Sequence, residues 1–222
     1  MTRAQMTEPR LYGGKSKSQR RSDREARLVD AALELFGRQG YSAVSGDRLA
    51  SEAGVTGRHL YQDHGGKEGV LIALYRRLFW DALSEVREAL DASDPSLWTP
   101  EGQLTVGVRT YVDYLIGDPR RLQILAVECV GVSEAVDKVG WEACDAFADL
   151  VVGRVALLPD TNALRFIELG WTPYALLRVR VGIVLAHELI VGWSRLESPP
   201  PIDTVVDDVV NIALGLARRP PA

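Results

Sequence analysis

The sequence is poor in the residues that build disulfide scaffolds and metal sites. It contains two cysteines and three histidines in 222 residues, and neither type is clustered. So few cysteines exclude a disulfide-rich secreted fold, and scattered His and Cys argue against a metal site. His187 is followed by Glu188, but no second histidine stands at the spacing of a zinc-protease helix. We therefore expect no metal and no cofactor.

Long apolar runs are also missing from the sequence. No stretch reaches the roughly 18 or more residues of a membrane span, and the longest, residues 181–193, is interrupted by His187 and Glu188. The first residues are charged and lack the apolar centre of a secretion signal. The sequence has neither a Gly-rich phosphate loop nor a Ser–His–Asp pattern. These absences predict a cytoplasmic protein that is not an enzyme.

Acidic residues outnumber basic ones overall, but the two signs are unevenly distributed. The chain has 26 Lys and Arg against 30 Asp and Glu, whereas residues 1–68 hold 12 basic and 9 acidic side chains. Residues 1–24 alone hold seven basic and two acidic side chains. A basic leading segment on an acidic remainder favours a polyanion as the partner of the N-terminal part. The alternative is a solvated tail that only improves solubility.

Hydrophobic periodicity indicates helices along the chain. Ser22 and Glu25 have the spacing of a capping box, and apolar residues follow at helical spacing as far as Phe36, before Gly37 and Gly40. Pro173 predicts a kink in the penultimate helix, near Trp171. No segment shows the alternation of a strand, so we predict an all-α fold of about nine helices. The other helices are expected at about 47–53, 57–63, 67–92, 101–116, 119–129, 133–157, 163–194 and 203–218.

Residues 45–67 have the pattern of a helix-turn-helix. Two short helices flank Gly54, whose backbone freedom suits a tight turn, and Thr56 is placed to cap the second helix. Arg58, His59 and Gln62 are polar on one side of that helix, and Arg and Gln pair with guanine and adenine edges in the major groove. The alternative is an ordinary helical hairpin with a solvated polar face.

A longer run of residues resembles the N-terminal DNA-binding domain of TetR-type transcriptional regulators. It covers residues 28–71, and the matching positions are Leu28, Ala31, Ala32, Phe36, Gly40, Tyr41, Leu49, Ala50, Ala53, Gly54, Val55, Thr56, Leu60, Tyr61, Lys67 and Leu71. The resemblance implies a flexible basic arm at residues 1–21, a DNA-binding domain at 22–68, and an effector-binding and dimerisation domain at 69–222. The partners it implies are an operator in double-stranded DNA, a small and mainly apolar or aromatic effector, and a second copy of the chain.

The resemblance also implies roles for residues of the DNA-binding domain. Thr56, Tyr61 and Lys67 match positions that hold phosphates. The basic residues Arg20, Arg21, Arg24 and Arg48 are expected to add contacts to DNA, and Arg58 and Gln62, with His59, are the expected base readers. Three departures from the family pattern, Gly46, Gly57 and His64, put the DNA affinity in doubt.

By the same resemblance, the effector cavity lies among the middle helices. The candidate lining residues are Trp80, Tyr111, Tyr114, Glu128, Trp141, Phe147 and His187. Glu128 interrupts an apolar run, so its carboxylate either points to solvent or a salt bridge, or is buried with a partner. Cys129 and Cys144 are expected to be buried and inert, with a thiol switch as the alternative.

The last two helices are the expected dimer interface. Their candidate interface residues are Gly182, Ala186, Val205, Val209, Ala213 and Leu216. Two apolar helices from each subunit pair naturally around a two-fold axis. The alternative is that both helices bury these residues against their own subunit.

Together these features predict a ligand-responsive repressor that binds a palindromic operator as a homodimer and is released by its effector. The alternative, from another class, is a helical small-molecule binding or interaction protein whose helix-turn-helix no longer reads DNA. An enzyme ranks behind both, because the sequence supplies no base, nucleophile or cofactor cradle.

Overall fold

The computed structural model describes residues 16–155, 157–158 and 173–218. Within these residues there are nine α-helices, one 3-10 turn and one π-helical turn, and no strand. The predicted all-α fold is confirmed. None of the helices among these residues is long and apolar enough to cross a membrane, and the same residues contain no cluster of His, Cys, Asp and Glu suited to a metal ion.

The first helix, α1 (Lys17–Gln39), begins earlier than its sequence pattern predicted. Ser16 caps it and forms a capping box with Gln19, so the expected box of Ser22 and Glu25 is wrong. Residues 17–21 are therefore helical and do not belong to a flexible arm. The Lys, Gln and Arg residues in this segment favour helix. Arg21, together with Arg24 further along α1, also gains a contact with α3 that sequence spacing does not reveal.

Two short helices follow, as the helix-turn-helix pattern predicted. They are α2 (Gly46–Glu52), capped by Ser45, and α3 (Gly57–His64), capped by Thr56. Gly54 turns the chain between them with a positive φ of 61°, a conformation that costs glycine little. Leu60 of α3 is fully buried, as are Leu49 of α2 and Phe36 of α1 in the same core. One face of α3 therefore packs on the core, and the opposite face is exposed to solvent.

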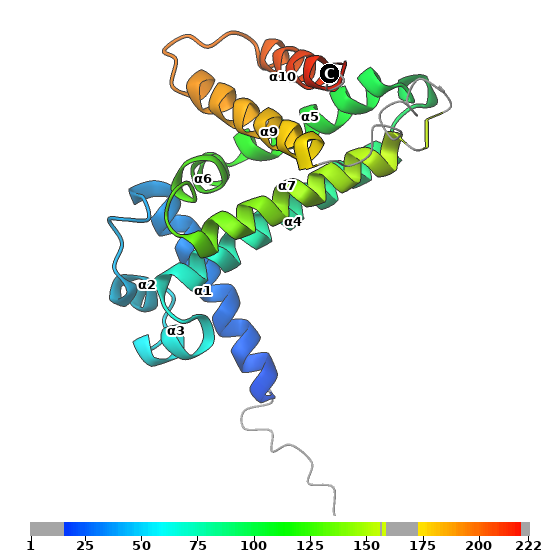
Figure 1. Cartoon of the computed structure of the whole chain (residues 1–222). Coiled ribbons are helices and arrows are strands. Elements are labelled where there is room, and N and C mark those ends of the chain that lie inside the picture. Colours follow the sequence, from blue (N-terminus) through cyan, green and yellow to red (C-terminus); the bar gives the residue numbers. More distant parts are fainter. Residues whose placement is uncertain (1–15, 156, 159–172, 219–222) are drawn as a thin grey trace, which may run out of the picture.

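The long helix α4 (Lys67–Asp91) connects the small N-terminal bundle to the rest of the molecule. It packs against α1 and α3 at one end and runs alongside α5 (Pro100–Gly117) and α7 (Glu134–Val155) for the remainder. Figure 1 shows α4 and α7 side by side, with α9 (Pro173–Ser194) and α10 (Ile202–Arg218) lying across them. A 3-10 turn, η1 (Pro95–Leu97), separates α4 from α5.

The expected helix at 119–129 is broken in the structure. Residues Pro119–Gln123 form the short helix α6, and Ile124–Glu128 form a π-helical turn, η2. Such turns insert extra backbone into a helix and are frequent at functional sites. The break matters because both pieces pack against α1 and so form, besides α4, a second contact between the N-terminal bundle and the rest of the chain.

Two further sequence expectations concern α1 and α9. Gly37 was expected to end the first helix, but it lies inside α1, and Gly40 is its C-cap. A methyl group on Gly37 would stand 2.6 Å from Cβ of Arg120, so this glycine permits the close approach of α6. The kink predicted near Trp171 lies outside the described residues, and Pro173 is the first residue of α9, where proline sacrifices no helical hydrogen bond.

Candidate functional site

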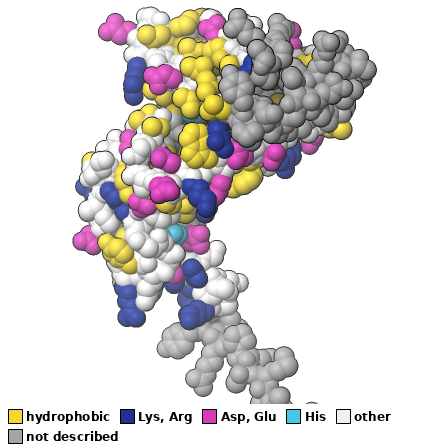
Figure 2. Space-filling model, in the orientation of Figure 1, with side chains coloured by type: hydrophobic (Ala, Val, Ile, Leu, Met, Phe, Trp, Pro, Cys, Tyr) yellow, Lys and Arg dark blue, Asp and Glu magenta, His cyan; other side chains and the backbone are white. Residues whose placement is uncertain are grey.

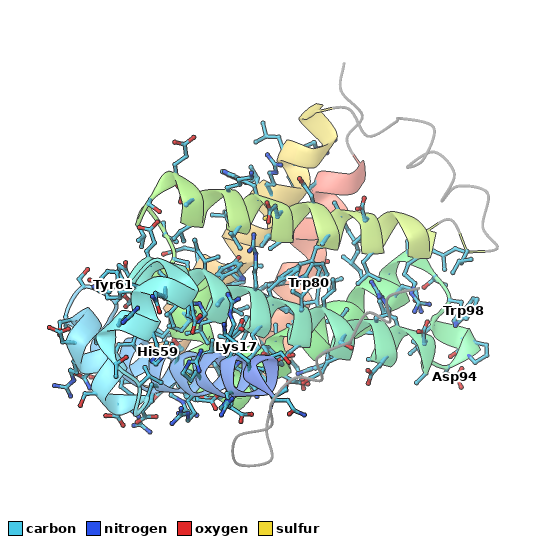
Figure 3. The ribbon with its side chains drawn as sticks, turned by 90° about the horizontal axis from the view of Figure 1, so that it is seen from below. Lys17, His59, Tyr61, Trp80, Asp94 and Trp98 are labelled. Atoms are coloured by element: carbon cyan, nitrogen blue, oxygen red, sulfur yellow. The ribbon has the colours of Figure 1, made fainter. Side chains whose placement is uncertain are left out.

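The exposed face of α3 is the first candidate site. Arg58 and Gln62 are exposed and one helical turn apart, and the Tyr61 side chain is 64% exposed. Figure 3 shows His59 and Tyr61 at one end of the molecule, far from Trp98 at the other. In Figure 2 Lys and Arg side chains gather at this lower end, over α3 and the beginning of α1. The expected base-reading residues therefore share a solvent-facing surface of a well-supported helix.

Thr56 and His59 interact with each other at the beginning of α3. The Thr56 hydroxyl accepts a hydrogen bond from the His59 backbone N–H and lies 2.9 Å from His59 Nδ1. His59 is half-buried as a result. Thr56 acts as the helix cap predicted from sequence, and its contact fixes the orientation of the His59 ring.

Lys67, expected at a phosphate, holds the α1–α2 loop. Its Nζ donates to the Tyr41 carbonyl at 2.9 Å and to the Val44 carbonyl at 2.8 Å, and lies 4.0 Å from the centre of the Tyr41 ring. Two of the three ammonium donors are thus used within the protein. One N–H donor of Lys67 remains for a phosphate. Besides the expected contact with DNA, Lys67 therefore also stabilises the α1–α2 loop.

The remaining basic candidates lie on α1 and α2. Arg48 is exposed on α2. Arg21 and Arg24, which were expected to contact DNA, both form ion pairs with Asp63 of α3. Sequence reasoning missed Asp63, because nothing in the chain pattern connects residues so far apart.

The three departures from the family pattern have different local consequences. A methyl group on Gly46 would lie 3.4 Å from Leu60 Cδ2, so a larger residue there would press on the buried side of α3. Gly57 has ordinary space around it, with its nearest neighbour at 3.8 Å. His64 Nε2 is buried with no hydrogen-bond partner in the part of the chain that the structure describes, which is a cost at the end of α3.

Glu128 joins the two parts of the molecule. Its carboxylate accepts hydrogen bonds from the Tyr41 backbone N–H and from Gln123 Nε2, each at 2.7 Å. It is half-buried with partners, so the solvent-facing alternative is wrong. Nearby, Arg120 at the beginning of α6 pairs with Glu34 of α1 and with Asp118, and these two contacts raise the pKa of its guanidinium. Glu128 therefore lies at the junction of η2 with the α1–α2 loop, away from the aromatic cluster described next.

Three of the predicted effector residues meet in an aromatic cluster of α5, α7 and α9. The Tyr111 hydroxyl and His187 Nε2 are 2.7 Å apart, and the two rings stack with centroids 5.8 Å apart. Phe147 meets Tyr111 edge-on at 5.2 Å and Phe79 at 5.4 Å. Phe79 was missed, although it falls on the apolar stripe of α4 with Ala82 and Val86.

Desolvation perturbs both polar members of this cluster. It lowers the pKa of His187 to about 4 and raises that of Tyr111 well above its usual value. His187 is therefore neutral at pH 7, with one ring nitrogen as donor and the other as acceptor. Both side chains nevertheless keep some solvent-accessible area. The pair is thus deep within the protein without being sealed from solvent.

The other predicted effector residues lie elsewhere. Trp80 is mostly exposed and packs its edge on Phe79. Trp141 is also exposed, with Arg180 over its ring. Tyr114 is buried beneath Arg121, whose guanidinium donates to the Tyr114 carbonyl. Burial raises the pKa of Cys129 to about 12 and that of Cys144 to about 11, as for unreactive thiols.

The expected dimer residues pack mainly within the subunit. Ala186, Val205 and Val209 are buried, and a methyl group on Gly182 would lie 3.2 Å from Leu216 Cδ1. The apolar stripe of α10 thus faces α9 and α5, and Ala213 is half-buried on the same helix. This burial fits the alternative given above for these residues. An exposed apolar face lies on α9 and consists of Leu177, Val181, Val184 and Leu185.

Comparison with known proteins agrees with this arrangement. Residues 28–74 match the family model of bacterial regulatory proteins of the tetR family. The chain is 28% identical over 215 residues to the HTH-type transcriptional activator FasR of Mycolicibacterium smegmatis, covering 94% of this chain and 90% of the relative.

Two solved structures share the fold. The fatty acid degradation regulator FadR from Bacillus halodurans superposes with a TM-score of 0.64 at 18% identity, covering 86% of this chain and 94% of that one. FadR from Bacillus subtilis, in complex with stearoyl-CoA, gives a TM-score of 0.63 at 16% identity, with 87% and 97% covered. Residues 28–74 therefore form an N-terminal helix-turn-helix domain of the tetR-family type, and the whole chain shares its fold with regulators of that kind.

Proposed function

We propose that this regulator binds a palindromic operator as a homodimer and that a small, mainly apolar effector controls the binding. The observation that carries the proposal is the exposed polar face of α3, where Arg58 and Gln62 stand one turn apart on a helix fastened by Leu60. Arg58 and Gln62 read bases in the major groove, with His59 beside them. Residues 22–68 serve DNA binding and residues 69–222 serve the effector and the dimer.

Phosphate contacts surround this reading face. Tyr61 has an exposed ring and hydroxyl, Thr56 lies at the helix N-terminus where anions bind well, and Lys67 keeps one free donor. Arg48 of the neighbouring helix adds positive charge. Because the protein acts on the chromosome, we place it in the cytoplasm.

The second copy of the chain docks on α9. Its exposed face carries Leu177, Val181, Val184 and Leu185, whereas the exposed side of α10 carries Asp203, Asp207 and Asp208. In Figure 2 hydrophobic side chains gather over α9. An apolar patch of this kind on a soluble domain marks an interaction surface. A two-fold pairing of α9 presents two α3 helices to one face of DNA, which accounts for a palindrome.

The effector is an apolar chain with one hydrogen-bond acceptor, such as an acyl thioester. The cluster of Phe79, Tyr111 and Phe147 suits a chain, and the Tyr111–His187 pair retains one O–H or N–H donor for a carbonyl oxygen. The FadR structure from Bacillus subtilis holds stearoyl-CoA, which makes this compound the first to test.

The effector-free protein represses transcription by occupying an operator that overlaps a promoter. The second candidate is activation, which the name of the mycobacterial relative favours. The position of the operator relative to the promoter decides between repression and activation. The same protein–DNA complex blocks RNA polymerase when it overlaps the promoter and can assist the polymerase when it lies beside it. Deletion of the gene raises transcript levels of its targets under the first account and lowers them under the second.

Selection of bound fragments from sheared genomic DNA, followed by footprinting, tests the proposal. We expect a two-fold symmetric footprint, and we expect stearoyl-CoA to weaken that complex while the free acid and CoA serve as controls. Binding that disappears equally for all fragments as salt rises would leave only nonspecific attraction and support the alternative of a protein that no longer reads DNA.

A further inference from the structure

An ion-pair clamp connects the beginning of α1 to the end of α3. Arg24 Nη2 lies 3.1 Å and Arg24 Nε 3.4 Å from Asp63 Oδ2, and Arg21 Nε lies 3.3 Å from Asp63 Oδ1. The Asp63 side chain is only 15% exposed and that of Arg24 only 23%, whereas that of Arg21 is 61% exposed. Arg24 is thus the well-defined partner, and both carboxylate oxygens of Asp63 are occupied.

Asp63 is an unfavourable residue for its position if considered alone. It is the penultimate residue of α3, where the helix dipole disfavours negative charge. It also adds negative charge to the element that faces a polyanion in the proposed complex. Local helix stability and general DNA affinity would both be served better by a neutral residue.

A contact with another helix offsets these two disadvantages of Asp63. The recognition helix has eight residues, and its buried contact is the fully covered Leu60 near its middle. Leu60 holds the middle of α3 and does not by itself hold the last turn. The Arg24–Asp63 pair adds a polar attachment at the C-terminal end of α3. Two Arg24 donors converge on one carboxylate oxygen, and a half-buried charge-assisted contact of this kind is directional.

We propose that Asp63 is a positioning residue for DNA reading, held by Arg24 with support from Arg21. The clamp sets the orientation of α3, and thereby the directions in which Arg58 and Gln62 point into the groove. This proposal rests on the proposed DNA binding through α3. It also assigns Arg24 to the protein interior rather than to a phosphate.

The direction in which one substitution changes operator affinity distinguishes this proposal from a simple effect of charge. Asp63→Asn removes a negative charge from a surface near DNA, so charge alone predicts tighter binding to every sequence. The clamp predicts the opposite for the operator, because α3 loses its orientation. The matched control is Glu52→Gln, which removes an exposed carboxylate from the last residue of α2 in the same domain.

The experiment measures binding of each variant to the selected operator and to a scrambled duplex at several salt concentrations. For Asp63→Asn and Arg24→Ala we expect the ratio of operator to scrambled affinity to fall about tenfold, equivalent to about 1.4 kcal/mol. The double variant should lose no more than either single variant, since both break one contact. Glu52→Gln should keep the wild-type ratio.

Two results would overturn the clamp. One is Asp63→Asn binding the operator as tightly as wild type or more tightly. The other is Arg24→Ala weakening operator and scrambled DNA equally with a smaller salt slope, as a phosphate contact would. Failure of the proposed DNA binding is distinguishable, because the wild-type protein itself would then show no preference for any duplex. The pair is still measurable in that case, as a coupling energy in a double-mutant cycle of unfolding.

Discussion

Burial of the Tyr111–His187 pair makes the stability of the protein sensitive to acid. The pKa of His187 falls from 6.5 to about 4 in the folded chain because the imidazole is desolvated. Between these values the unfolded chain binds a proton that the folded chain does not, so stability rises with pH. The stabilising contribution is complete above the unfolded pKa and is lost as pH falls through this window.

We expect the unfolding free energy of the wild-type protein to decrease from pH 6.5 toward pH 4 by up to about 1.4 kcal/mol per pH unit from this group. His187→Gln keeps a hydrogen-bonding side chain beside Tyr111 but removes the titration. Urea unfolding of both proteins at pH 7, 6 and 5 measures the difference. Parallel profiles for the two proteins would show that His187 is not held neutral by burial.

Lys67 illustrates how a surface lysine becomes structural. Its ammonium donates to the carbonyls of Tyr41 and Val44 and so bridges two residues of the α1–α2 loop. Lys67→Met preserves the chain length and removes both hydrogen bonds, and we expect an unfolding free energy lower by about 1–3 kcal/mol. Lys17→Met, at the exposed first residue of α1, is the matched control and should change it little. Equal stability of the two variants would refute the structural role.

Residue roles divide into those visible in local spacing and those that need tertiary contacts. The Thr56 cap and the polar positions Arg58 and Gln62 follow from spacing within one helix, and the structure places them as predicted. Lys67, Glu128 and Asp63 each have a partner between 23 and 87 residues away in sequence, so no local pattern reveals these contacts.

At the scale of elements, η2 lies between the two candidate sites. It packs against α1 on one side and α9, which carries His187, on the other. Glu128 at its end holds the Tyr41 N–H of the α1–α2 loop. A change in the aromatic cluster therefore has a contiguous packed route to the helix-turn-helix.

We expect Glu128→Ala to weaken the control of DNA binding by the effector. Stearoyl-CoA should bind the variant as it binds wild type but should release the operator several-fold less effectively, because the hydrogen bond that joins η2 to the loop is lost. Glu128→Gln retains an amide oxygen as acceptor and should restore much of the response. Titrations of effector against protein and against the operator complex separate the two quantities. Unchanged release by Glu128→Ala would place the coupling elsewhere.

Helix positions were predictable from periodicity, with two exceptions. The early start of α1 goes with the capping box of Ser16 and Gln19, and the π-turn η2 packs against both α1 and α9. A hydrophobic repeat encodes neither a polar cap nor a contact with a distant helix. Apolar stripes on α9 and α10 likewise indicate burial without showing which partner covers them.

For the whole molecule, the proposed dimer depends on the exposed apolar face of α9. Val184 is 59% exposed near the centre of this face. Val184→Asp should convert the dimer to a monomer at micromolar concentration without unfolding the subunit, since the side chain leaves no internal cavity. Asn211→Asp introduces the same charge on the exposed side of α10 and should remain dimeric. Light scattering checks both, and a dimeric Val184→Asp protein would contradict this interface.

The account as a whole depends on α3 reading bases with its exposed face. The most direct measurement compares wild type and Arg58→Ala on the selected operator and on its single-base-pair variants over a range of salt. We expect Arg58→Ala to lose about 1–3 kcal/mol and to relax preference at one base pair in each half-site, with the salt slope nearly unchanged. Uniform weakening on every duplex, together with a reduced salt slope and unaltered preference, would contradict base reading by this helix.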